Sequence, residues 1–147
     1  MLLGHYEQKF DQDKGRTAIP SSFRKQIGQK AIITKGYEDS LMIIAVKDWQ
    51  NVIEKVSDQN LLSAFSRQTD RFLLGNAFEI VFDSQGRFII PNKLRLFAHL
   101  SKDIVFVGVG SRVEIWDKKS WENNDKYLKE NIAQLSEKLD EKIRQNR

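Results

Sequence analysis

Two short glycine–arginine turns carry the side chains that could bind another molecule. Gly15-Arg16 and Gly86-Arg87 each follow an aspartate and precede three mostly apolar residues and a proline. Arginine presents a rigid, permanently charged fork that can grip a phosphate or bind guanine O6 and N7 together. Glycine beside it removes a side chain that would hold the turn away from a phosphate backbone. The turns therefore suit a nucleic acid.

An aspartate ahead of each arginine can orient its guanidinium across the turn. Asp83 and Arg87 stand at D-x-x-x-R spacing, whereas one extra residue separates Asp11 from Arg16. Either Asp13 replaces Asp11 as the orienting acid, or the turn bulges to accommodate the extra residue. An exposed Asp–Arg pair contributes only about 0–1 kcal/mol, so one such hairpin alone would be an ordinary surface turn.

Basic residues surround both turns. No acidic residue occurs from Lys14 to Tyr37 or from Gln85 to Lys102, and the net charge of the chain is +4. A basic patch is expected for a polyanion partner, although a solvated basic face would have the same composition. For Lys14, Arg24 and Arg95, contact with a phosphate and simple exposure to solvent are two equally open interpretations. The candidate DNA-binding residues are Lys14, Gly15, Arg16, Arg24, Gly86, Arg87 and Arg95.

The turns belong to a longer internal repeat. Leu2-Leu3-Gly4 reappears as Leu73-Leu74-Gly75, and the residues after Pro20 are matched by those after Pro91. Each copy is about 45 residues long, near the size at which a lone core stops being sufficient, so the copies should share one core. We expect a first repeat over residues 5–48, a helical connector over 49–75, a second repeat over 76–119 and a C-terminal helix over 120–147.

Short apolar runs bounded by turn residues predict a mainly β chain with short helices, an α+β fold. Ser21-Ser22 should cap a helix that stops at Gly28. Asp48 should cap another that begins at Trp49, and a third should follow Pro91. The segment 57–75, which joins the two copies, is too apolar for a flexible linker, so we expect it to form a packed helix. The predicted strands span residues 5–10, 17–19, 31–34, 41–46, 78–82, 88–90, 104–107 and 112–116.

The last predicted helix begins at Ser120 or Trp121 and carries one apolar stripe on an otherwise polar rod. The stripe consists of Leu128, Ile132, Leu135, Leu139 and Ile143. Most helical stability in proteins comes from packing such a face. We therefore expect the stripe to bury against the body of the protein or against another subunit.

Composition argues against several other functions. The chain has no cysteine, and neither His5 nor His99 belongs to an acid cluster at metal spacing, so we expect no catalytic residue, metal or cofactor. The sequence contains no acid, base and nucleophile in an arrangement typical of an active site. We therefore expect neither an enzyme nor a small-molecule substrate. No apolar run approaches the roughly 20 residues of a membrane span, and the lack of cysteine is compatible with a cytoplasmic protein.

Several motifs together resemble the MraZ family of bacterial transcription regulators. They are LLG, KGR…IP and KGYEDSL in the first repeat, and RFLLGNAFE, DSQGR…IP and EIWD in the second. The resemblance covers about residues 1–125. It implies an AbrB-like swapped-hairpin, double-split β-barrel, in which two SpoVT-AbrB-like repeats interleave within one chain.

The same resemblance implies a function. Family members form rings, bind double-stranded DNA near the start of the division and cell-wall gene cluster, and associate with the nucleoid. It therefore implies a cytoplasmic, homo-oligomeric, sequence-specific regulator that acts upstream of that cluster, including its own gene. The alternative is an AbrB-like antitoxin or another protein-interaction module. Antitoxins commonly have a disordered toxin-binding tail, whereas this tail has the pattern of a helix.

Overall fold

The computed structural model describes residues 1–57 and 61–146 of the chain. Residues 58–60 of the predicted connector and Arg147 of the predicted C-terminal helix lie outside the described residues. The chain divides into two compact units, Met1–Asp117 and Lys118–Arg147. The first unit, named the β body below, contains both glycine–arginine turns.

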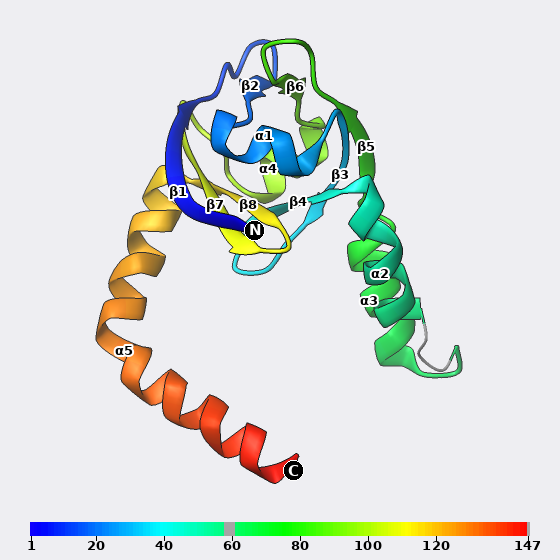
Figure 1. Ribbon diagram of the computed structural model, residues 1–147, viewed down its shortest axis with the longest axis vertical. Helices are drawn as coiled ribbons and strands as arrows, with labels where there is room; N and C mark the ends of the chain where they lie inside the picture. The colour runs from blue at the N-terminus through cyan, green and yellow to red at the C-terminus, as the bar shows by residue number, and fades with distance from the viewer. Residues whose placement is uncertain (58–60, 147) are drawn as a thin grey trace. The chain divides into compact units, whose positions relative to one another are not determined.

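The elements of the β body occur in the same order twice (Figure 1). The first set is β1 (Leu2–Lys9), β2 (Arg16–Ala18), α1 (Ser21–Ile27), β3 (Lys30–Lys35) and β4 (Leu41–Ala45), and α2 (Val46–Ser57) follows it. After α3 (Ala64–Leu73), the second set is β5 (Phe78–Val81), β6 (Arg87–Ile89), α4 (Asn92–Phe97), β7 (Asp103–Gly110) and β8 (Val113–Asp117). A final helix, α5 (Lys118–Gln145), forms the second unit. The predicted α+β class is confirmed.

The strands of the two repeats interleave. The six-stranded sheet has the order β1-β7-β8-β4-β3-β5, and a separate two-stranded ribbon joins β2 to β6. Exchanging each strand for its equivalent in the other repeat gives the same order read backwards. The first strand of each repeat pairs with the other repeat, β1 with β7 and β5 with β3. This swapped pairing is the arrangement that the family resemblance implied.

Both repeats contribute to one hydrophobic core. Phe23 and Ile33 of the first repeat are buried in the same cluster as Leu94 and Phe106 of the second. Strand alternation places the inner face of each short strand in this cluster. Because the core is built from both halves, neither repeat can complete it alone.

The helix starts differ from the sequence-based expectations. Pro20 is the N-cap of α1, and no side chain caps that helix, so the predicted role of Ser21-Ser22 is wrong. Pro20 has the extended backbone usual for an N-cap, and its carbonyl accepts a hydrogen bond from the amide of Phe23 at 2.9 Å. Strand β4 runs directly into α2 at Val46, which places Asp48 in the first turn of α2 instead of at its cap. An acidic residue still suits that position because of the helix dipole.

The connector and the last helix expose more apolar surface than we expected. Leu73 of α3 is buried, but Leu61, Leu62 and Phe65 are 75%, 84% and 88% exposed, so the expected packing holds for one end of the segment. Helix α5 begins at Lys118, earlier than predicted, and none of its residues is buried. Burial of its apolar stripe stays a prediction. Within the described residues, no helix is long and apolar enough to cross a membrane.

Two leucines on α4 test the shared core. The side chain of Leu94 is fully buried, whereas that of Leu96 is 67% exposed. Leu94→Ala should lower the free energy of unfolding by about 2–5 kcal/mol, because it leaves a cavity. Leu96→Ala, the matched control, should change it by no more than about 0.5 kcal/mol. Urea denaturation measures both, and equal effects would contradict this assignment of the core.

Candidate nucleic-acid interface

The β2–β6 ribbon places the two turn arginines on one face. Each arginine lies opposite an aliphatic residue of the other strand in the antiparallel register. Side chains alternate along a strand, and the central pair, Thr17 and Phe88, points inward, with 5% and 3% exposure. Arg16 and Arg87 therefore share the outer face. They are diagonal neighbours across the two strands, a relation in which the backbones of the two residues are typically about 7–8 Å apart. Both turns lie at one end of the β body, at the top of Figure 1.

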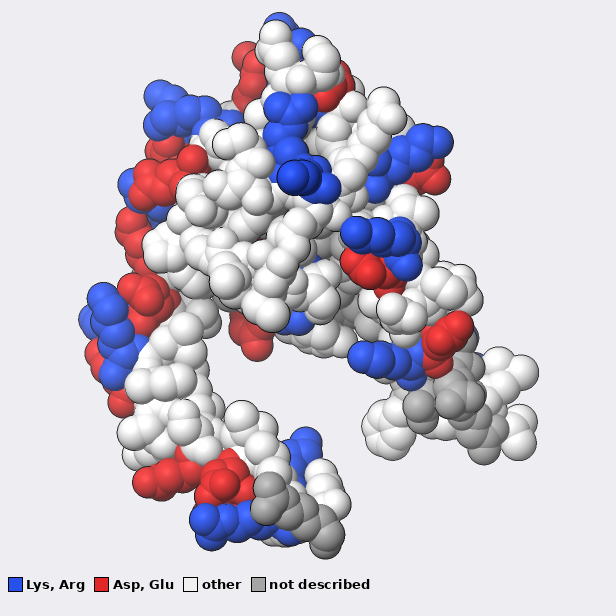
Figure 2. Space-filling model, in the orientation of Figure 1, with Lys and Arg blue, Asp and Glu red and all other residues white. Residues whose placement is uncertain are grey.

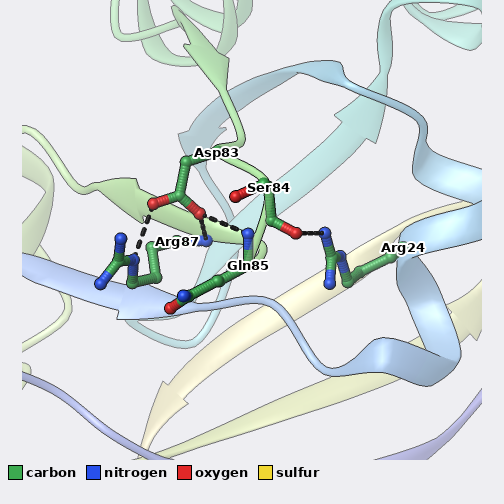
Figure 3. Close-up of polar contacts among 5 residues, drawn as sticks. All are labelled: Arg24, Asp83, Ser84, Gln85 and Arg87. Carbon is green, nitrogen blue, oxygen red and sulfur yellow. Dashed lines mark hydrogen bonds and ion pairs between the residues drawn. The ribbon is translucent and has the colours of Figure 1, made fainter.

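The carboxylate of Asp83 organises the second turn (Figure 3). Its Oδ1 accepts hydrogen bonds from the amides of Gln85 and Arg87 at 2.9 and 2.8 Å, and its Oδ2 accepts one from Nε of Arg87 at 2.7 Å. The hydrogen bonds from the amide and the side chain of Arg87 lower the pKa of Asp83 from 3.8 to about 2. Arg87 is thus oriented through one edge of its guanidinium, and within the described residues its Nη groups form no hydrogen bond.

Asp11 stands at the start of the first turn, where Asp83 stands in the second, and it holds the loop by hydrogen bonds. Its Oδ1 accepts from the amides of Asp13 and Lys14, both at 3.0 Å. Its backbone carbonyl accepts from the amides of Gly15 and Arg16, at 2.7 and 3.2 Å. The Asp11 carboxylate thus bonds amides of the longer loop, and Asp13 contributes its amide to that loop.

The longer first turn changes what the acid can reach. The extra residue turns the Asp11 carboxylate toward amides of the loop, and the amide of Arg16 bonds the Asp11 carbonyl instead. In residues 1–57 and 61–146, the guanidinium of Arg16 has no hydrogen bond or ion pair, whereas that of Arg87 is paired with Asp83. The two turns are therefore equivalent in position but not in how firmly they hold their arginines.

The helix arginines lie against the turns of the opposite repeats. Arg24 of α1 donates to the carbonyl of Ser84 at 2.8 Å, and Arg95 of α4 lies against the first turn. Gly15 and Gly86 are both buried, and a Cβ on either would meet one of these guanidiniums. Their small size thus makes room for an arginine of the protein, whereas we expected it to make room for a phosphate. Sequence spacing gave no signal for this crossed contact.

The charge around the turns is mixed. Lys14 is exposed at the tip of the first turn. Figure 2 shows basic side chains over α1, and acidic side chains above them at the top and along one side of the β body. An open depression of about 630 Å³ beside the second turn is lined by residues that include Arg24, Lys25 and Ser84. Among the residues that the structure describes, no group of three or more His, Cys, Asp or Glu could hold a metal.

These features define a class of duplicated swapped-hairpin proteins that display an arginine turn from each repeat. A family model described as "MraZ protein, putative antitoxin-like" matches residues 1–72 and again residues 73–145. The chain belongs to the MraZ family.

Relatives of known name match along nearly the whole chain, and each is called transcriptional regulator MraZ. The one from Caldanaerobacter subterraneus subsp. tengcongensis is 40% identical over 140 residues, which cover 95% of this chain and 97% of the relative. The one from Thermoanaerobacter sp. is 38% identical over 141 residues, covering 96% and 98%. The one from Pediococcus pentosaceus is 40% identical over 139 residues, covering 95% and 96%. These relatives of the chain are thus named as transcriptional regulators.

The pKa of Asp83 can be measured directly. The folded value of about 2 lies below the ordinary value of 3.8, so ionised Asp83 stabilises the fold above about pH 4. That contribution is lost as the pH falls through about 2. An NMR titration of side-chain carboxyl groups should give Asp83 a midpoint near 2, and a higher one in Arg87→Met. A wild-type midpoint near 4 would contradict the turn geometry.

Proposed function

We propose that this protein is a sequence-specific, DNA-binding transcriptional regulator of the MraZ type. It would act on the region upstream of division and cell-wall genes, including its own gene, in the cytoplasm and in association with the nucleoid. The observation that carries the proposal is the pair of arginines on one exposed face of the β2–β6 ribbon. Family membership supports the regulatory role, because the named relatives are transcriptional regulators.

The chemistry of each turn suits a different contact with DNA. Asp83 holds Nε of Arg87, so the two Nη groups have a fixed direction. A fixed fork can form the bidentate contact with guanine O6 and N7 in the major groove. The guanidinium of Arg16, without such a tether in the described part of the chain, can adapt to a phosphate. Exposed Lys14 adds a second phosphate contact in that turn.

Tight binding would need several chains. One chain supplies few basic groups to the DNA, and its net charge is only +4. Linked weak sites gain affinity through effective concentration. We therefore propose a homo-oligomer, a ring in the arrangement that the family resemblance implies, with the arginine turns of several chains on one duplex. The antitoxin alternative would instead need a partner protein on the tail or the body.

Alanine variants of the turn arginines test the proposal. Arg87→Ala should weaken binding to the upstream duplex by about 1–3 kcal/mol if Arg87 reads a guanine. Arg16→Ala should lower the affinity for every duplex by the same factor. It should also reduce the slope of log K against log salt concentration by about 0.9, the loss of one phosphate contact. Fluorescence anisotropy at several salt concentrations measures both effects.

Arg112→Ala is the control, because it removes one charge from the β7–β8 turn. It should leave operator affinity nearly unchanged. If both turn variants stay folded and assembled yet bind like wild type, the turns do not carry DNA binding.

The apolar stripe of α5 leads to a prediction about assembly. Ile132, Leu139 and Ile143 are 54%, 60% and 46% exposed, and such a face is expected to pack. Deleting the chain from Asp125 onward should leave a folded β body with a changed subunit count. Light scattering and circular dichroism check this. An unchanged oligomer would contradict a role of the tail in assembly, and an unfolded product would contradict the independence of the β body.

A further inference from the structure

We propose that Arg24 and Arg95 are positioning residues, and that each holds the DNA-contacting turn of the opposite repeat. The proposal rests on the DNA-binding function proposed above. It assigns these two arginines a role other than direct contact with phosphate. It also makes the two repeats depend on each other for binding.

The contact at the second turn is the closer one (Figure 3). Nη2 of Arg24 donates to the carbonyl of Ser84 at 2.8 Å. Ser84 directly follows Asp83, the acid that orients Arg87. A Cβ built on Gly86 would lie 2.9 Å from Nε and 3.0 Å from Cδ of Arg24. The side chain of Arg24 is therefore packed flat against the turn as well as hydrogen-bonded to it.

The first turn repeats this arrangement with the roles of the repeats exchanged. Nη1 of Arg95 donates to the carbonyl of Gln12 at 3.4 Å, a longer and weaker hydrogen bond. A Cβ on Gly15 would lie only 2.6 Å from Nη1 of Arg95. Within the described residues, Nε of Arg95 is buried and donates to no acceptor. Its burial against the turn shows that this arginine, too, is directed toward the protein.

Backbone hydrogen bonds cross between the repeats at the same two places. The amide of Ile19 donates to the carbonyl of Gly86, and that of Ile90 donates to the carbonyl of Gly15, both at 2.9 Å. Each turn is thus held by the other repeat twice, once through its glycine carbonyl and once through a helix arginine. The duplicate occurrence argues against an accidental contact.

The crossed contacts predict a crossed pattern of energetic coupling. Loss of Arg24 should release the second turn and so remove the benefit of Arg87, but it should leave Arg16 unaffected. Loss of Arg95 should do the converse. Direct phosphate contacts would give effects that simply add, since independent sites behave additively.

Double-mutant cycles on operator affinity in the full chain provide the test. We expect Arg24→Ala and Arg87→Ala to be coupled by at least about threefold, and Arg24→Ala and Arg16→Ala to be additive. Arg95→Ala should couple with Arg16→Ala and be additive with Arg87→Ala. Lys25→Ala and Lys93→Ala, which remove one charge from α1 and α4, should be additive with every turn variant.

A lysine variant separates positioning from charge. Arg24→Lys keeps the positive charge but lacks the planar fork that lies on Gly86. It should therefore bind DNA as weakly as Arg24→Ala if Arg24 positions the turn. Recovery of wild-type affinity by lysine, additivity throughout, or coupling within a repeat would each overturn the proposal.

Amide hydrogen exchange measures how firmly each turn is held without any DNA, so its result does not depend on the proposed function. In Arg24→Ala, amide exchange should speed up at Gln85 and Gly86 but not at Lys14 and Gly15, with no DNA present. Unchanged exchange at both turns would contradict positioning, whereas a wild-type chain that binds no duplex would refute only the DNA function.

Should Arg24→Ala not fold, Gly86→Ala displaces the same guanidinium with one added methyl. Its control is Gly110→Ala, at a similar positive φ of +93 with no neighbour within 4 Å. Gly86→Ala should weaken operator binding clearly more than Gly110→Ala. Equal effects would overturn the proposal.

Discussion

The antiparallel pairing of β2 with β6 joins the two repeats directly beneath the glycine–arginine turns. Backbone amides and carbonyls that are buried must find partners, and each of these short strands pairs along its length with the equivalent strand of the other repeat. The pairing brings Thr17 and Phe88 into the shared core and leaves both arginines outside. One register thus determines the packing of the β body and the spacing of its candidate binding groups.

Duplication made the fold symmetric, and one residue made the site asymmetric. The order of the six-stranded sheet is unchanged when the repeats are exchanged. The extra residue of the first turn redirects the Asp11 carboxylate to loop amides, while Asp83 in the shorter turn holds Arg87. Two copies of one module can therefore serve different contacts without any change in the surrounding fold.

The sequence predicted the features that local pattern controls. The strands, the turn positions and the shared core all followed from apolar runs, glycine and proline, and from the small size of each repeat. The starts of α1 and α2 were missed because Pro20 and the direct passage from β4 into α2 replace the usual side-chain cap.

The crossed contacts of Arg24 and Arg95 could not have been predicted from the sequence. They join residues separated by 60 and 83 positions, and depend on a register that no local pattern encodes. For the same reason, the glycines were assigned to the ligand side of the turns.

In the proposed function, the two turns face DNA while the other end of the β body does not. A photo-crosslinking residue placed at Gln12, at Gln85 or at Ser111 tests it most directly, because all three positions are exposed in turns of the β body. With the upstream duplex at moderate salt, we predict crosslinks from Gln12 and Gln85 and none from Ser111 in the β7–β8 turn. Efficient crosslinking from Ser111, with none from the glycine–arginine turns, would contradict the account.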